Sequence, residues 1–456
     1  MTNILFLRIL PFIGSLLSLI LAIVFASMVR KKSRGTDRMK EISDAIFIGS
    51  RAYLNQQARI MAIFFVVLII LFGTMVYFKY LQWPSLPAFA TGMGFSLLIG
   101  YIGMWISTTS NSRVTYAAQK KGLGEAMNIA FTAASASGLL LATVALFDTA
   151  FWFNILYWYY GRSSANPVDS MESVVNILIT FTIGASFAAF FMRTGGGIYT
   201  KAADMGADYV GKVESGLAED DYRNPATIAD NVGDNVGDVG GMKADSLESW
   251  VGAIIATEFL GFLAFRGSQL MLNSIILPMI ISTAGAIASI LAIFIIKIIV
   301  GRYKENATVS KLTATTLTGL FITVIGIVIM SYFIVRYILG ASYNFLFFAN
   351  LGGVFAGFLI GLFTLLYTDS RYRPTRNISE SAKSGPATVV VNGLAYGMES
   401  ALLPALTVIA VMLFAFFISG GNQDFRMGLY GVSLAAVSML SVTPFAITID
   451  VYGPIA

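Results

Sequence analysis

The sequence predicts an all-α fold, a polytopic bundle of transmembrane helices. Apolar residues make up 56% of the 456 residues and charged residues only 12%, about half the share that soluble domains carry. The apolar residues gather in evenly spaced runs that are long enough to cross a bilayer as helices. Because only helices and closed barrels satisfy their own backbone within lipid, such runs favour a helical bundle.

Eleven apolar runs mark the expected spans. The first run is too long for a signal peptide and lacks its small-residue cleavage site, so we expect it to be retained. The small residues of Thr132–Gly138 predict close packing between helices. We expect one integral-membrane domain over residues 1–456, with spans near residues 4–29, 60–82, 86–108, 126–152, 173–200, 225–262, 269–297, 313–335, 344–367, 386–418 and 427–452.

The basic residues indicate the orientation of the chain. The segment after the first run carries Arg30, Lys31 and Lys32, and alternate loops further along repeat this excess. The loops between them hold about one basic residue each, such as Lys79 and Arg266. Because cytoplasmic loops are enriched in Lys and Arg, the N-terminus is expected outside and the 201–225 segment on the cytoplasmic side.

Composition also limits the chemistry. The chain contains no cysteine and no histidine, which excludes disulfides, thiolate nucleophiles, the usual zinc sites and a histidine base. The net charge of +5 comes from residues spread over many loops, so no nucleic-acid partner is expected. Any catalysis must therefore use carboxylates, lysines, arginines and amides.

Charged side chains follow helical spacing in the segment 193–258. A first series stands three or four residues apart, so one face of a helix carries Lys201, Asp204, Asp208 and Lys212. Carboxylates one turn apart repel each other unless a cation lies between them. Lysines placed among these carboxylates indicate an additional, anionic ligand.

A second series follows at steps of four residues, with Asp230, Asp234 and Asp238 in a row. Asp245 lies two turns further on, and Glu248 one turn beyond it. Oxygen ligands without histidine or cysteine favour hard cations such as Mg²⁺. With the lysines, the two series predict a site for metal ions and a phosphate compound, of the kind that serves phosphoryl transfer.

Simpler interpretations apply to parts of this segment. The Asp-rich run resembles a calcium loop, but it has glycine at Gly241, where an EF-hand needs a closing glutamate. A solvated acidic face is an equally good explanation of Glu219, Asp220 and Asp221. It does not explain Asp245 and Glu248, which lead directly into an apolar span, where carboxylates are usually functional.

Two cations are candidate partners for these intramembrane carboxylates. Arg193 closes the preceding apolar run, where an ordinary interfacial anchor is the alternative, and Lys243 lies close to Asp245 in the chain.

The whole segment resembles the membrane-integral inorganic pyrophosphatases, a family of sixteen-span homodimeric ion pumps. The matching motifs are GGGIYTKAADMGADYVGKVE (Gly195–Glu214) and EDDYRNPATIADNVGDNVGD (Glu219–Asp238). Three further stretches resemble the family over Glu41–Gln57, Tyr372–Pro404 and Ile449–Ala456. The resemblance covers the whole chain. It implies hydrolysis of magnesium pyrophosphate at the cytoplasmic face and export of Na⁺ or H⁺, with Na⁺ or K⁺ as potential activators.

The resemblance also implies residue roles. Lys201 and Lys212 would contact pyrophosphate. The implied magnesium ligands are Asp204, Asp208, Asp230, Asp234, Asp238 and Glu219, with Glu214 assisting or lying in a solvated loop. Asp238 would position and deprotonate the attacking water, and Asp234 is counted with it as catalytic.

An ion gate is implied below this site, built from Arg193, Asp245 and Glu248. Glu248 lies one turn after Asp245, while Gly252 occupies the position two turns after it. This arrangement resembles sodium pumps, although some proton pumps share it, so sodium is the preferred expectation. Lys243 departs from the small residue expected at its position.

The family continues beyond the motif that ends at Ala456, so we expect a truncated sequence of about eleven spans that is inactive alone. Two alternatives remain: a divalent-cation transporter or channel, and a non-catalytic shortened membrane subunit. The expected location is a prokaryotic cell membrane, with a eukaryotic acidic organelle as the second choice.

Overall fold

The structure, a computed structural model, describes residues 4–163, 166–221, 223–303 and 308–456. It confirms the all-α prediction, since these residues form α-helices with short 3-10 and π-helical pieces and no strand. In this part of the chain eleven helices are long and apolar enough to cross a membrane, as many as the apolar runs. The chain is therefore a multi-pass integral membrane protein.

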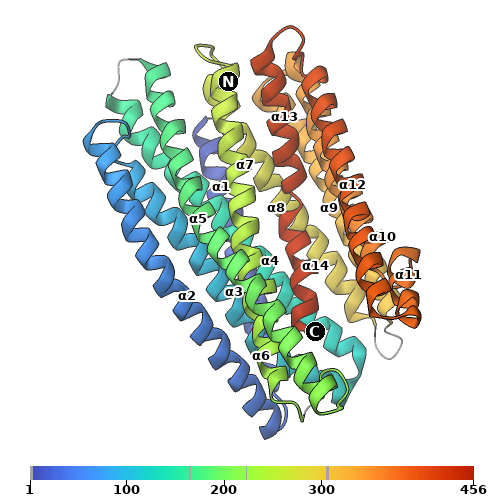
Figure 1. Ribbon diagram of the computed structural model, residues 1–456. Coiled ribbons are helices and arrows are strands. Elements are labelled where there is room, and N and C mark those ends of the chain that lie inside the picture. Colours follow the sequence, from blue (N-terminus) through green and yellow to red (C-terminus); the bar gives the residue numbers. More distant parts are fainter. Residues whose placement is uncertain (1–3, 164–165, 222, 304–307) are drawn as a thin grey trace.

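The helices run up and down through one bundle (Figure 1). Their bounds are α1 (Ile4–Arg30), α2 (Asp37–Tyr77), α3 (Ser85–Lys121), α4 (Leu123–Ser163), α5 (Pro167–Asp208), η1 (Tyr209–Glu214), α6 (Ala226–Gly233), η2 (Asp234–Gly241), α7 (Met242–Ala264), α8 (Met271–Gly301), α9 (Val309–Ile338), η3 (Ala341–Tyr343), α10 (Phe345–Thr368), α11 (Arg373–Ser381), η4 (Ala382–Ser384), α12 (Pro386–Ile418), α13 (Phe425–Leu440) and α14 (Thr443–Ile455).

The core of the bundle surrounds α4, whose apolar stretch is completely buried. This helix packs against α1, α3, α8 and α14. A methyl group at Gly138 would overlap the backbone of Pro444 on α14, which confirms that the small residues of Thr132–Gly138 permit close packing. By contrast, α2 and α12 lie at opposite edges (Figure 1), and only 6% of the apolar stretch of α12 is buried.

Several helices extend well beyond the apolar runs. The second helix begins at Asp37, where Thr36 accepts a hydrogen bond from the Met39 amide at 3.3 Å. The third continues to Lys121, and the fifth remains helical into the segment expected to leave the membrane at residue 200. Hydropathy marks only the part of a helix that lies in lipid, whereas the helices themselves continue beyond the apolar part.

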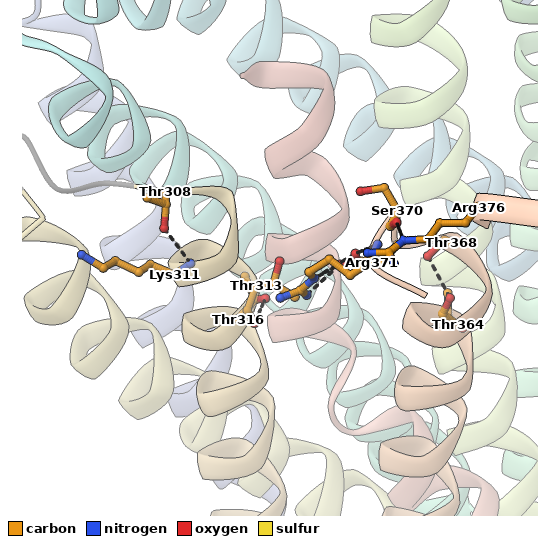
Figure 2. A network of polar contacts seen from close by, with 10 residues as sticks. Thr308, Lys311, Thr313, Thr316, Thr364, Thr368, Ser370, Arg371 and Arg376 are labelled. Atoms are coloured by element: carbon orange, nitrogen blue, oxygen red, sulfur yellow. Dashed lines mark hydrogen bonds and ion pairs between the residues drawn. The ribbon is translucent and has the colours of Figure 1, made fainter. Parts of the chain in front are cut away.

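Polar side chains gather where α9 begins and α10 ends (Figure 2). Thr308 begins α9 by accepting a hydrogen bond from the Lys311 amide at 3.3 Å. From the end of α10, the Arg371 side chain points toward Thr313 on α9 (Figure 2) and forms a 2.7 Å ion pair with Asp369. Polar side chains from both helices therefore gather at the end where α9 and α10 pack together.

Candidate functional site

The two charged series lie on helical segments that pack closely together, α5 and the continuous segment formed by α6 and η2. Glycines permit this approach: a Cβ on Gly196 would lie 2.9 Å from the Cα of Gly237. A methyl group on Gly237 would overlap the hydroxyl of Thr200. That hydroxyl donates to the carbonyl of Gly233 at 2.8 Å, so the two segments are also held by a hydrogen bond.

A hollow of about 440 Å³ opens between these segments, and both charged series contribute to its wall. Lys201 and Asp204 come from α5, while Asp230, Asp234 and Asp238 come from α6 and η2. The sequence-predicted stripes therefore face one another across a shared space. Its remaining lining consists of Arg193, Gly197 and Thr200.

A second, narrower hollow adjoins the first on the side of η1. It shares Asp204 and Asp230 with the first hollow and adds Asp208 and Lys212. The loop after η1 closes it with Glu219 and Asp220. The expected residues thus surround two connected spaces, with one lysine in each.

Both lysines already contact carboxylates. Lys201 Nζ donates to Asp204 Oδ2 at 2.9 Å, while Lys212 Nζ lies 2.9 Å from both Asp208 and Glu219. The Lys201 side chain is 76% exposed, so it is free to turn toward a ligand without unpacking the helix. An anion that enters the hollows can bind the two ammonium groups. The carboxylates that these lysines now contact can then bind metal ions.

The helix changes its winding at both hollows. The segments η1 and η2 are π-helical, a form that usually appears as single turns at functional sites. Both Asp234 and Asp238 of η2 line the first hollow. This change in periodicity was not predictable from the spacing of the aspartates.

The carboxylate oxygens around the first hollow are of the ligand type that Mg²⁺ prefers. In the described residues no three acidic side chains stand close enough to bind one metal ion together. Mg²⁺ usually keeps several waters and binds through one or two carboxylates plus phosphate oxygens, so paired carboxylates around an open space suit it. The first hollow provides such carboxylates beside room for an anion.

Arg193 connects the hollow with the expected ion gate. It lines the hollow, and its Nε lies 3.9 Å from Asp245 Oδ2 on α7. Glu248 is turned toward α5, where its Oε1 accepts a hydrogen bond from Ser186 at 2.5 Å. The three expected gate residues therefore lie between α5 and α7, but Glu248 is bound to a serine that the sequence did not indicate.

Lys243 is not a partner of these carboxylates. Its side chain is completely buried and donates to the Ser137 hydroxyl of α4. It fills the space left by Gly103 on α3, since a Cβ there would lie 2.5 Å from the ammonium. The expectation that Lys243 is a partner of the intramembrane carboxylates was wrong, because its position in the helix turns it toward α3 and α4.

The structure shows which acidic residues in and beside the loop between η1 and α6 line the hollows and which do not. Composition alone could not distinguish them. Asp221 accepts hydrogen bonds from the Arg223 side chain and amide, which lower the pKa of its carboxyl to about 2. Asp221 and the exposed Glu214 line neither hollow. Glu219 and Asp220 do line the second hollow.

Asp450 on α14 was missed by the sequence analysis as a member of this region. It lies within electrostatic reach of Arg193, although nearly two hundred and sixty residues separate them in the chain. The motif Ile449–Ala456 was a signal that could have drawn attention to it.

Together the fold and the site define a multi-pass membrane protein with a carboxylate- and lysine-lined chamber above a charged intramembrane cluster. Residues 16–456 match the family model of inorganic H⁺ pyrophosphatase. The chain belongs to this family.

Individual relatives cover almost the entire chain. One from Bacteroides thetaiotaomicron is 41% identical over 450 residues. A K⁺-insensitive pyrophosphate-energized proton pump from Methanosarcina mazei is 38% identical, and a K⁺-stimulated pyrophosphate-energized sodium pump from Thermotoga maritima is 36% identical. The matches cover 97%, 97% and 95% of this chain, but only 60%, 61% and 61% of the respective relatives. The chain thus spans about three fifths of their length.

Proposed function

We propose that this chain serves a pyrophosphate-energised ion pump, which hydrolyses magnesium pyrophosphate at the cytoplasmic face and exports Na⁺ or H⁺. The observation that carries the proposal is the presence of lysines and facing carboxylates around the same connected hollows. A site for metal alone gains nothing from ammonium groups among its ligands. A diphosphate bound with metal ions requires both kinds of charge.

In this proposal Lys201 and Lys212 bind phosphate oxygens after leaving their present carboxylate partners. The proposed magnesium ligands are Asp204, Asp208, Asp230, Asp234, Asp238 and Glu219. Bound Mg²⁺ would neutralise the diphosphate and stabilise the negative charge that develops as the bridging bond breaks. The wall residues hold the anion in the hollow and position it for attack.

Water is the proposed nucleophile. The chain has no histidine or cysteine, and Asp238 lies in the wall of the first hollow beside Asp234. A carboxylate there can orient a water molecule and accept its proton as a general base. We assign this role to Asp238, with Asp234 as the second catalytic carboxylate.

Arg193, Asp245 and Glu248 are proposed to form the ion gate. Arg193 lies against both the substrate hollow and Asp245, so a bound anion would attract its guanidinium away from the gate carboxylate. The freed carboxylates could then accept an ion. We favour Na⁺ from the spacing of Asp245 and Glu248, although the similar relatives include both a sodium pump and a proton pump.

Other properties follow from the family. We propose a homodimer in a prokaryotic cell membrane, with Mg²⁺ required and Na⁺ or K⁺ as potential activators. Similar relatives are named both K⁺-stimulated and K⁺-insensitive. The segment 193–258 is proposed as the catalytic and gate part of one membrane domain.

Hydrolysis tests the catalytic proposal. Because the relatives are longer, the assay uses a chimera that continues this chain with the remainder of the Bacteroides thetaiotaomicron relative. Asp238→Asn should lower phosphate release from pyrophosphate at least about a hundredfold, the scale of a lost general base. Asp221→Asn is the matched control, since Asp221 lines neither hollow. Undiminished turnover in Asp238→Asn would remove this residue from catalysis.

Transport tests the ion assignment. Inside-out vesicles carrying the chimera should take up radioactive sodium when pyrophosphate is added, and Glu248→Gln should reduce this uptake. Proton uptake that is independent of sodium, without sodium transport, would contradict the choice of Na⁺ and leave the pyrophosphatase proposal intact.

A further inference from the structure

A separate basic hollow lies at the cytoplasmic ends of α1, α2 and α3. Its volume is about 230 Å³, and three arginines line it: Arg30, Arg34 and Arg113. Phe47 and Trp105 add two aromatic walls. None of these residues belongs to the catalytic hollows or the gate.

The three arginines are fixed in different ways. Arg113 donates to the carbonyls of Lys32 at 3.1 Å and Arg30 at 3.3 Å, so it secures the turn after α1. Arg34 pairs with Asp44. Arg30 lies over the Trp105 ring, 5.4 Å from its centre, and no carboxylate in the described chain forms an ion pair with it. Its guanidinium is therefore available to an anion.

The positive charge continues beside this hollow. An adjoining depression shares Arg113 and adds Lys32, Lys120 and Lys121. Its one carboxylate, Glu125, is already paired with Lys32 at 2.7 Å. A general excess of basic residues in cytoplasmic loops explains the sign of this charge, but not its concentration around a concave, aromatic-walled site.

Apolar surface leads from the hollow toward the bilayer. α1 and α2 both pack on α3, and exposed apolar side chains follow within two turns of the hollow on two of these helices. Ile23 lies two turns before Arg30 on the same face of α1 and is 57% exposed, and Tyr101 and Leu98 precede Trp105 on the same face of α3, 36% and 47% exposed. A free phosphate ion would make no contact with this apolar surface, whereas the acyl chains of a lipid would cover it.

We propose that the hollow binds the phosphate headgroup of an anionic phospholipid, whose acyl chains lie along α1 and α3. Arg30 and Arg34 contact the phosphate, with Arg34 shared between the lipid and Asp44. Arginine suits this role because its guanidinium forms paired hydrogen bonds with phosphate oxygens. Basic pockets between transmembrane helices on the cytoplasmic side are suited to acidic headgroups.

Lipid selectivity tests the proposal. The purified chain is reconstituted in phosphatidylcholine vesicles containing spin-labelled phosphatidylglycerol, and the motionally restricted fraction of the label is measured. The double variant Arg30→Gln with Arg34→Gln should weaken selective association about thirtyfold, as expected for two lost charges near the membrane surface. Arg38→Gln is the matched control, because Arg38 lies near the same turn, pairs with Glu41 and does not line the hollow.

Two results would overturn the proposal. Equal selectivity in the double variant and in Arg38→Gln would show that the hollow holds no lipid. Displacement of the label by excess glycerol phosphate would show that a soluble phosphate compound suffices. Circular dichroism of the double variant checks folding, and Arg30→Lys, which keeps the charge, should retain most of the selectivity if the site binds as described.

Discussion

Asp230, Asp234 and Asp238 stand in one row along α6 and η2 and all face the first hollow. Without metal their charges repel, at a cost of about 0.5 kcal/mol for each neighbouring pair. Asp234→Asn removes two such contacts, so it should raise the thermal midpoint of the chain in a chelator. With Mg²⁺ and imidodiphosphate, a non-hydrolysable pyrophosphate analogue, the wild type should become the more stable protein. The same order under both conditions would contradict a ligand-binding role.

One carboxyl group that lines neither hollow is buried elsewhere in the bundle. Glu258 on α7 is fully buried, and neither of its oxygens has a hydrogen-bond partner in the described structure. Burying polar atoms without a partner is costly. Glu258→Leu should therefore leave the free energy of unfolding unchanged or raise it by up to about 2 kcal/mol. Thermal unfolding followed by circular dichroism measures this, and a clear loss of stability would reveal a partner that the structure does not show.

At the level of helices, the approach of α5 to η2 brings the two charged series together. Gly237→Ala would press a methyl group against the Thr200 hydroxyl and should cost about 1–3 kcal/mol of stability, the range for overpacking. Gly206→Ala on α5 is the control, because its Cβ would meet no atom within 4 Å. The thermal midpoints of both variants test this. Equal midpoints would mean that the packing adapts and that the helices do not need the glycine.

Sequence periodicity predicted these helices well but not their details. Eleven apolar runs correspond to eleven helical spans in the part of the chain that the structure describes, because lipid permits little besides a helix. The facing of the two charged series also agrees with the predicted spacing, although the roles assigned to their residues remain to be tested. The π-helical turns, the burial of Lys243 and the proximity of Asp450 to Arg193 depend on contacts between distant helices. No local pattern contains that information.

For the whole molecule, the orientation can be tested directly because the chain has no cysteine. Single cysteines are introduced at Ser215, in the loop between η1 and α6, and at Ser268, in the loop between α7 and α8. In intact cells a membrane-impermeant maleimide should label only the Ser268→Cys variant. Labelling of Ser215→Cys from outside would reverse the orientation and place the catalytic hollows on the wrong face.

The same long helices carry both the hollows proposed for catalysis and the proposed gate. α5 bears Lys201 and Asp204 near its cytoplasmic end, and Arg193 two turns deeper. η2 continues directly into α7, which carries Asp245 and Glu248. A shift that follows binding of an anion between the upper segments would therefore be transmitted to the gate through continuous helix.

The decisive question is whether metal and diphosphate bind together between α5 and η2. Electron paramagnetic resonance of Mn²⁺, used in place of Mg²⁺, measures free and bound metal in the purified chain. Imidodiphosphate should increase the bound fraction, and Lys201→Gln combined with Lys212→Gln should abolish that increase while metal still binds alone. If the analogue has no effect, or if the double variant responds as the wild type does, the hollows are a cation site and the proposed pyrophosphate chemistry does not take place there.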